Sequence, residues 1–163
     1  MSRLLRVLSL ATLAVVLSAG LATPAHAQRT DGTVGLGGQI GDPSGITLKF
    51  YNADAPSYDF LAAWSGIDDF FFLNGHALFE HDLRVENVDR PLEWFIGPGA
   101  FIGTFEQGRD GDDNLALGIS GTAGLQILLD DRFEIYLQAT PRFFLVPETD
   151  ANIGGGLGLR YYF

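Results

Sequence analysis

The feature that most constrains this chain is a two-residue alternation of apolar and polar side chains over most of its length. It is clearest at residues 132–145, where Phe133, Ile135 and Leu137 belong to one set and Glu134 and Tyr136 to the other. Successive side chains of a β-strand point to opposite faces, so a period of two indicates strands with one apolar face. The chain is therefore predicted to be all-β.

The alternation falls into eight segments separated by turn-forming stretches rich in Gly, Pro, Asp and Asn. No helical period of useful length follows residue 28. Eight strands joined by short turns predict an antiparallel up-and-down barrel. The predicted strands cover residues 33–41, 44–51, 58–67, 70–83, 92–105, 114–128, 132–145 and 152–163.

Residues 1–27 have the three parts of a secretory signal peptide. Arg3 and Arg6 precede an apolar run at residues 7–17, and Ala25-His26-Ala27 supplies the small residues of a cleavage site. A retained anchor helix is the alternative, but the run is shorter than the roughly 20 residues needed to span a bilayer. We predict cleavage after Ala27, leaving residues 28–163 as one barrel domain.

Composition excludes several classes of function. The chain has no cysteine, so disulfides, thiolate metal sites and cysteine nucleophiles are excluded. Its formal charge of −10 and the lack of a basic cluster argue against nucleic acid as a partner. No catalytic, metal-binding or cofactor-binding residue is assigned, and no cofactor is expected.

Alternation alone does not say which face points inward, because a soluble lipocalin-like barrel buries its apolar face and a membrane barrel exposes it. The polar face carries many glycines, which suit the narrow interior of an eight-stranded barrel. The predicted periplasmic strand ends carry aromatic residues on the apolar face, as at a membrane interface. This girdle comprises Phe50, Tyr58, Trp94, Phe133, Tyr161 and Phe163.

The chain ends with Gly-Leu-Gly-Leu-Arg-Tyr-Tyr-Phe, an alternating segment closed by an aromatic residue. This resembles the last strand of bacterial outer-membrane barrels, and residues 33–163 resemble the small eight-stranded OmpA, OmpX and OmpW transmembrane class. The resemblance implies a Gram-negative outer membrane as the location, with membrane lipid and lipopolysaccharide as partners. It also implies that the barrel assembly machinery recognises Tyr161 and Phe163. We expect a monomer.

The inferred lumen face carries charges of both signs, which must be paired because burying an isolated charge costs several kcal/mol. If Arg142 pairs with Gly154 across the last hairpin, Tyr136 faces Arg160 and Glu134 lies one diagonal step away. The lumen is predicted to hold a structural polar network of Lys49, Asp59, His76, Glu80, Glu93, Arg132, Glu134, Arg142 and Arg160.

Three functions follow from this fold. The first is a structural or envelope-interaction barrel without enzymatic activity. The second is a barrel that binds or passes a small apolar ligand, which Phe95, Phe101 and Phe105 on the inward face favour.

The third function is modification of lipid A, which requires a serine and a histidine in contact on the lipid face. A turn at Asp68-Asp69 places the candidate Ser65 opposite Phe72, away from His76, while His81 is expected to point outward near Trp94. Residues 109–114 weakly resemble a calcium loop but lack its distal glutamate, so a solvated loop is expected there.

Overall fold

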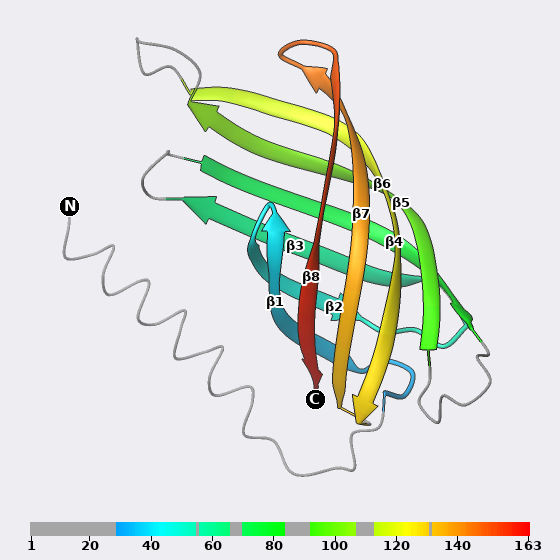
Figure 1. Ribbon diagram of the computed structural model, residues 1–163. Coiled ribbons are helices and arrows are strands. Elements are labelled where there is room, and N and C mark those ends of the chain that lie inside the picture. Colours follow the sequence, from blue (N-terminus) through cyan, green and yellow to red (C-terminus); the bar gives the residue numbers. More distant parts are fainter. Residues whose placement is uncertain (1–28, 55, 66–69, 84–91, 107–112, 131) are drawn as a thin grey trace, which may run out of the picture.

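The computed structural model describes residues 29–54, 56–65, 70–83, 92–106, 113–130 and 132–163. Eight strands form one closed antiparallel barrel in chain order (Figure 1), which confirms the predicted fold class. None of the described residues forms a helix long and apolar enough to cross a membrane. The strands are β1 (Val34–Asp42), β2 (Gly45–Phe50), β3 (Ser57–Ser65), β4 (Phe70–Asp82), β5 (Leu92–Glu106), β6 (Asp113–Asp130), β7 (Phe133–Val146) and β8 (Asp150–Tyr162).

The barrel closes where β1 pairs antiparallel with β8, from Gly35 opposite Tyr162 to Asp42 opposite Gly155. Closure leaves no strand at an edge, so every strand has a hydrogen-bonded neighbour on both sides. Strand length varies around the wall, from 6 residues in β2 to 18 in β6. In Figure 1 the β1–β2 hairpin (blue and cyan) therefore stops well below the tip of β7 and β8 (orange and red).

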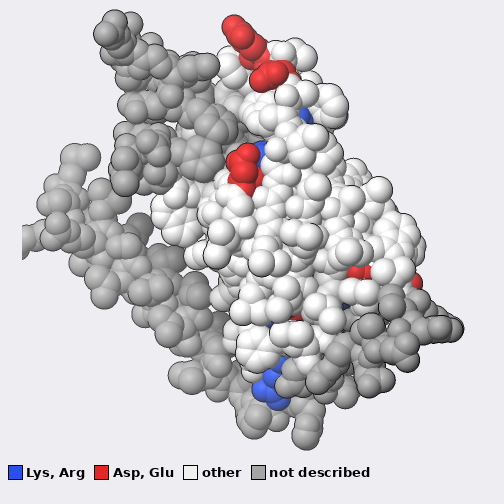
Figure 2. Space-filling model, in the orientation of Figure 1, with Lys and Arg blue, Asp and Glu red and all other residues white. Residues whose placement is uncertain are grey.

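The apolar set of side chains points outward and the polar set points inward. On β7, Leu137 is 59% exposed whereas the carboxylate-bearing Glu134 is fully buried. Figure 2 shows one outer face of the barrel, where few charged side chains interrupt the wall. A polar interior inside an apolar wall is the arrangement of a transmembrane barrel and the reverse of a soluble one.

Aromatic rings cluster on the outer face at the end of the barrel where β1 begins and β8 ends. Tyr161 contacts Phe133 and Phe163 edge to face, with centroid distances of 5.0 Å to each ring. His81 stacks on Trp94 at 4.5 Å, as the sequence predicts. Phe50, Tyr58 and the other predicted girdle residues lie at the same strand ends.

Glycines on the inward face sit beneath the large lumen side chains. A Cβ at Gly124 on β6 would come within 2.4 Å of the Phe95 ring and 2.3 Å of the Leu137 carbonyl oxygen. Gly158 is covered in the same way by Tyr136, and Gly118 by Phe101. Each of these glycines leaves the space that a neighbouring ring occupies, so the lumen packs by pairing the smallest residue with the largest.

This packing predicts opposite outcomes for two glycines on the same strand. Gly124→Ala should destabilise the barrel by about 1–3 kcal/mol, because the added methyl group overpacks the lumen. Gly121→Ala on the outer face should be close to neutral, since the nearest neighbouring atom, the Gly97 carbonyl oxygen, would lie 3.8 Å from the added methyl carbon. Urea unfolding of each variant in detergent micelles checks this, and equal midpoints for the two would contradict the packing account.

Candidate functional site

The centre of the lumen is a network of buried ion pairs around Glu134 on β7. Its Oε1 accepts from Arg160 Nη1 at 2.8 Å, and its Oε2 accepts from Lys49 Nζ at 3.1 Å and the Tyr162 hydroxyl at 2.6 Å. Arg160 also donates through Nη2 to Asp59 at 2.5 Å and lies over the Tyr136 ring at 3.8 Å. One carboxylate thus links β2, β7 and β8, and through Arg160 also β3.

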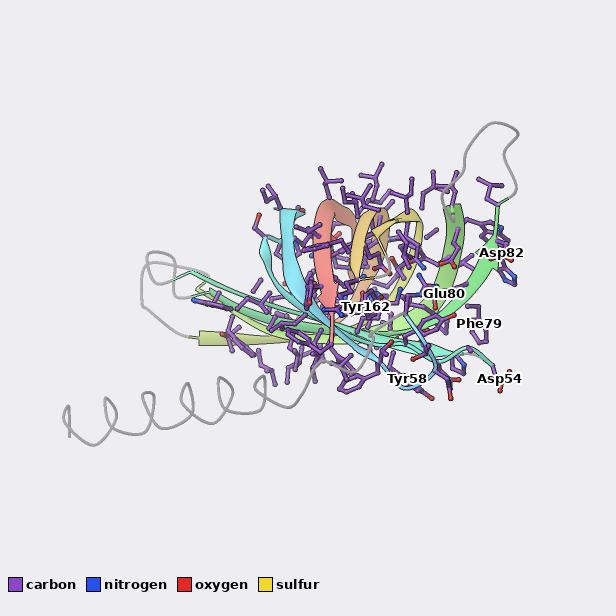
Figure 3. The ribbon with its side chains drawn as sticks, turned by 90° about the horizontal axis from the view of Figure 1, so that it is seen from below. Asp54, Tyr58, Phe79, Glu80, Asp82 and Tyr162 are labelled. Carbon is purple, nitrogen blue, oxygen red and sulfur yellow. The ribbon has the colours of Figure 1, made fainter. Side chains whose placement is uncertain are left out.

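Lys49 extends the network toward β4 and β6. Its Nζ donates to Glu80 at 2.6 Å and to the Gln126 side-chain oxygen at 2.9 Å. Gln126 in turn donates to Glu80 and, at 2.5 Å, to Glu93 on β5. In Figure 3 Tyr162 lies inside the ring of strands, while Tyr58 is on its outer side.

The charges of this network are satisfied by one another. Lys49, Glu134 and Asp59 are each no more than 1% exposed, and each makes at least one ion pair. Burying a charge costs free energy unless the charge is paired and hydrogen-bonded, and removing one partner leaves the remaining charges unpaired. The arrangement therefore joins the strands, and each described carboxylate of the network has an ion-pair partner.

A second polar group lies beside this network and contains His76. Ser120 on β6 lies 3.1 Å from His76 Nε2 and 2.9 Å from the Asn74 side-chain oxygen. Gly99 on the intervening β5 makes this possible, since a Cβ there would come within 2.3 Å of the His76 ring. The sequence reading missed Ser120, because nothing in its spacing marks it as the partner of a residue 44 positions away.

The half of the lumen farther from the start of β1 is aromatic. Phe72 stacks on Phe101 at 5.5 Å, and Phe101 meets Phe144 edge to face at 4.8 Å. Arg142 lies over Phe72 at 5.3 Å and pairs with Asp42 at 3.2 Å. Phe95 packs instead with Leu78 and Tyr136 in a separate buried cluster.

Arg29, which precedes β1, enters the lumen from the end where β1 begins. Its Nη2 donates to both oxygens of Glu93 at 2.8 and 2.6 Å, and its Nη1 donates to Glu134 at 3.4 Å. Burial by itself lowers the pKa of the guanidinium, but Glu93, Glu80 and Glu134 outweigh burial and raise that pKa well above its ordinary value. Arg29 was not predicted, because it lies outside the alternating segments.

The predicted network residues fall into separate groups. Lys49, Asp59, Glu80, Glu93, Glu134 and Arg160 are connected through the contacts above, whereas His76 and Arg142 have the partners just described. Arg132 donates to the hydroxyl of Tyr161 at 3.0 Å. The cleavage site, residues 109–112 and the side chains of Phe105, Asp113 and Asn114 lie outside the described part of the chain.

Two predicted registers are wrong. Arg142 pairs with Asn152 rather than Gly154, so Arg160 lies opposite Glu134, and Tyr136 lies opposite Gly158. Ser65 pairs with Phe70 rather than Phe72. His76 lies opposite Asp59, so Ser65 is remote from it, and the serine that His76 does contact is inside the lumen.

Loss of the central carboxylate should weaken the barrel strongly. Glu134→Gln leaves Arg160 and Lys49 without their shared anion, and breaking a buried pair in this way costs about 3–5 kcal/mol. Glu148→Gln on the exposed rim makes the same chemical change without a buried partner and should shift stability by less than about 0.5 kcal/mol. Urea unfolding followed by tryptophan fluorescence compares the two, and similar midpoints would refute the role given to Glu134.

No protein-family model matches the chain, and no curated protein matches it in sequence. Its fold is similar to that of the N-terminal β-barrel domain of Pseudomonas aeruginosa OprF, with a TM-score of 0.53 and 13% identity over 80% of this chain and 96% of that one. Neisserial surface protein A (TM-score 0.43, 11% identity, 80% and 94% covered) and Ail, the attachment invasion locus protein of Yersinia pestis (0.45, 15%, 80% and 97%), are also similar. The chain thus has the fold of the small eight-stranded bacterial outer-membrane barrels that its sequence resembles.

Proposed function

We propose that this chain is a closed outer-membrane barrel with a structural or envelope-interaction role and no enzymatic activity. The observation that carries the proposal is the fully buried Glu134 hub, whose bonds to Lys49, Arg160 and Tyr162 cross the lumen. An eight-stranded lumen is only wide enough to be filled by side chains. Here charged, hydrogen-bonded and aromatic groups fill it at successive levels.

The other two functions have weaker support. A lumen site for an apolar ligand needs aromatic side chains that face a cavity, but Phe95 and Phe101 are 1% and 3% exposed and pack against neighbouring side chains. A lipid-modifying enzyme needs its serine and histidine on the lipid face, but Ser120 and His76 contact each other on the lumen face. These observations favour a role that depends on the wall and rims of the barrel.

The first test of this proposal is location and closure. The mature protein should fractionate with the outer membrane and migrate differently on gels before and after heating, because a closed ladder resists SDS. Reconstituted in planar bilayers, it should give no discrete conductance steps, with a general porin as positive control. Stable conductance steps from the wild type would overturn the closed-barrel proposal.

The second test addresses enzymatic activity. Expression of the wild type should leave the mass spectrum of lipid A unchanged, and the Ser120→Ala and His76→Gln variants should give the same spectrum. A gain or loss of one acyl chain with the wild type, abolished in Ser120→Ala but retained in Ser65→Ala, would assign an activity to the Ser120–His76 pair.

A further inference from the structure

Hydrogen bonds hold the segment before β1, residues 29–33, against the end of the barrel. Its backbone pairs with the β2–β3 hairpin, with Gly32 N donating to Tyr51 O at 3.0 Å and Tyr51 N donating to Thr33 O at 2.9 Å. The Asp31 carboxylate accepts from Ala53 N at 3.0 Å. These bonds direct the side chain of Arg29 inward.

The Arg29 guanidinium occupies a site of matching shape and charge. One guanidinium nitrogen, Nη2, donates to both oxygens of Glu93, Tyr51 lies under the guanidinium at 4.1 Å, and Glu80 is 3.9 Å away. Its side chain is only 4% exposed although it precedes the first strand. The guanidinium contacts Glu93 through Nη2, Glu134 through Nη1 and the Tyr51 ring through its flat face, a combination that arginine provides and lysine does not.

Arg29 also lines a polar cavity of about 390 Å³ at this mouth, together with Tyr51, Glu80, Asp82 and Glu93. Figure 3 shows Glu80 and Asp82 at this end of the barrel. Glu80 contacts both Ser57 and Lys49, at 2.6 Å each. The guanidinium therefore stands between the outer cavity and the ion pairs of the lumen.

We propose that residues 29–33 form a strap that closes the lumen at the end where β1 begins, with Arg29 as its removable plug. Glu93, Glu80 and Tyr51 form the guanidinium seat, and the hydrogen bonds to the β2–β3 hairpin hold the strap over it. Release of Arg29 opens a path for water to Glu80 and Lys49 without unpacking the aromatic half of the lumen. With cleavage after Ala27, Arg29 would be the second residue of the exported chain, so a chain clipped slightly farther along would lose the plug.

Cysteine accessibility tests the strap directly, because the chain has no native cysteine. Ser57→Cys places a thiol behind Arg29 at a position that is 0% exposed, and Thr140→Cys places one deeper along the lumen at a position 5% exposed. Each is combined with Arg29→Ala, and the folded protein in micelles is treated with a small cationic methanethiosulfonate reagent. Labelling at position 57 should accelerate about tenfold or more in the Arg29→Ala background, while labelling at position 140 stays unchanged.

Two further variants sharpen the result. Arg29→Lys keeps the charge but lacks the second nitrogen that bonds Glu134 and the planar group that stacks on Tyr51, so its labelling rate should fall between those of the parent and Arg29→Ala. Arg132→Ala removes an arginine that bonds Tyr161 at the same end of the barrel and should leave both rates unchanged. Equal rates at position 57 with and without Arg29 would overturn the strap, and acceleration at both positions would show instead that Arg29 stabilises the whole barrel. Neither outcome depends on whether the barrel conducts ions.

Discussion

The structure depends on the neutralisation of charge inside a tube that has no room for bulk water. Glu134 accepts hydrogen bonds from Lys49, Arg160 and Tyr162, which come from β2 and β8. The bond from Lys49 on β2 to Glu134 on β7 spans the seam where β1 pairs with β8, so it joins strands that meet only when the barrel closes. An unpaired charge is costly in this low-dielectric interior. The completed network therefore favours the one arrangement of strands in which every charge is paired.

Packing complements this electrostatic constraint. Lumen glycines lie under Phe95, Phe101, Tyr136 and Tyr162, so each large side chain crosses its neighbouring strand where that strand has no side chain. Gly99 has the same relation to His76 and lets it reach Ser120 two strands away. The wall can therefore remain regular while its interior carries side chains of very different size.

The wall was predictable from the sequence because its periodicity is local. All eight strands, the direction of the apolar face and the aromatic girdle follow from alternation within each segment. Register was less predictable, because both wrong pairings, Arg142 with Gly154 and Ser65 with Phe72, are displaced by two residues. A displacement of two leaves every side chain on the same face, so alternation does not detect it. Arg29 and Ser120 were missed for a related reason: their partners are 64 and 44 positions away and share no motif with them.

In the membrane proposed for this barrel, the unequal length of its strands would have a consequence for the lipid. A strand that crosses a bilayer needs roughly 9–11 residues, and β6 exceeds this with 18, whereas β2 has 6. A bilayer meets a span that is too short by thinning locally or by letting the protein tilt. On this proposal the lipid would be thinnest next to β2 and its neighbour β1, where Ile46 and Ile40 are 48% and 80% exposed.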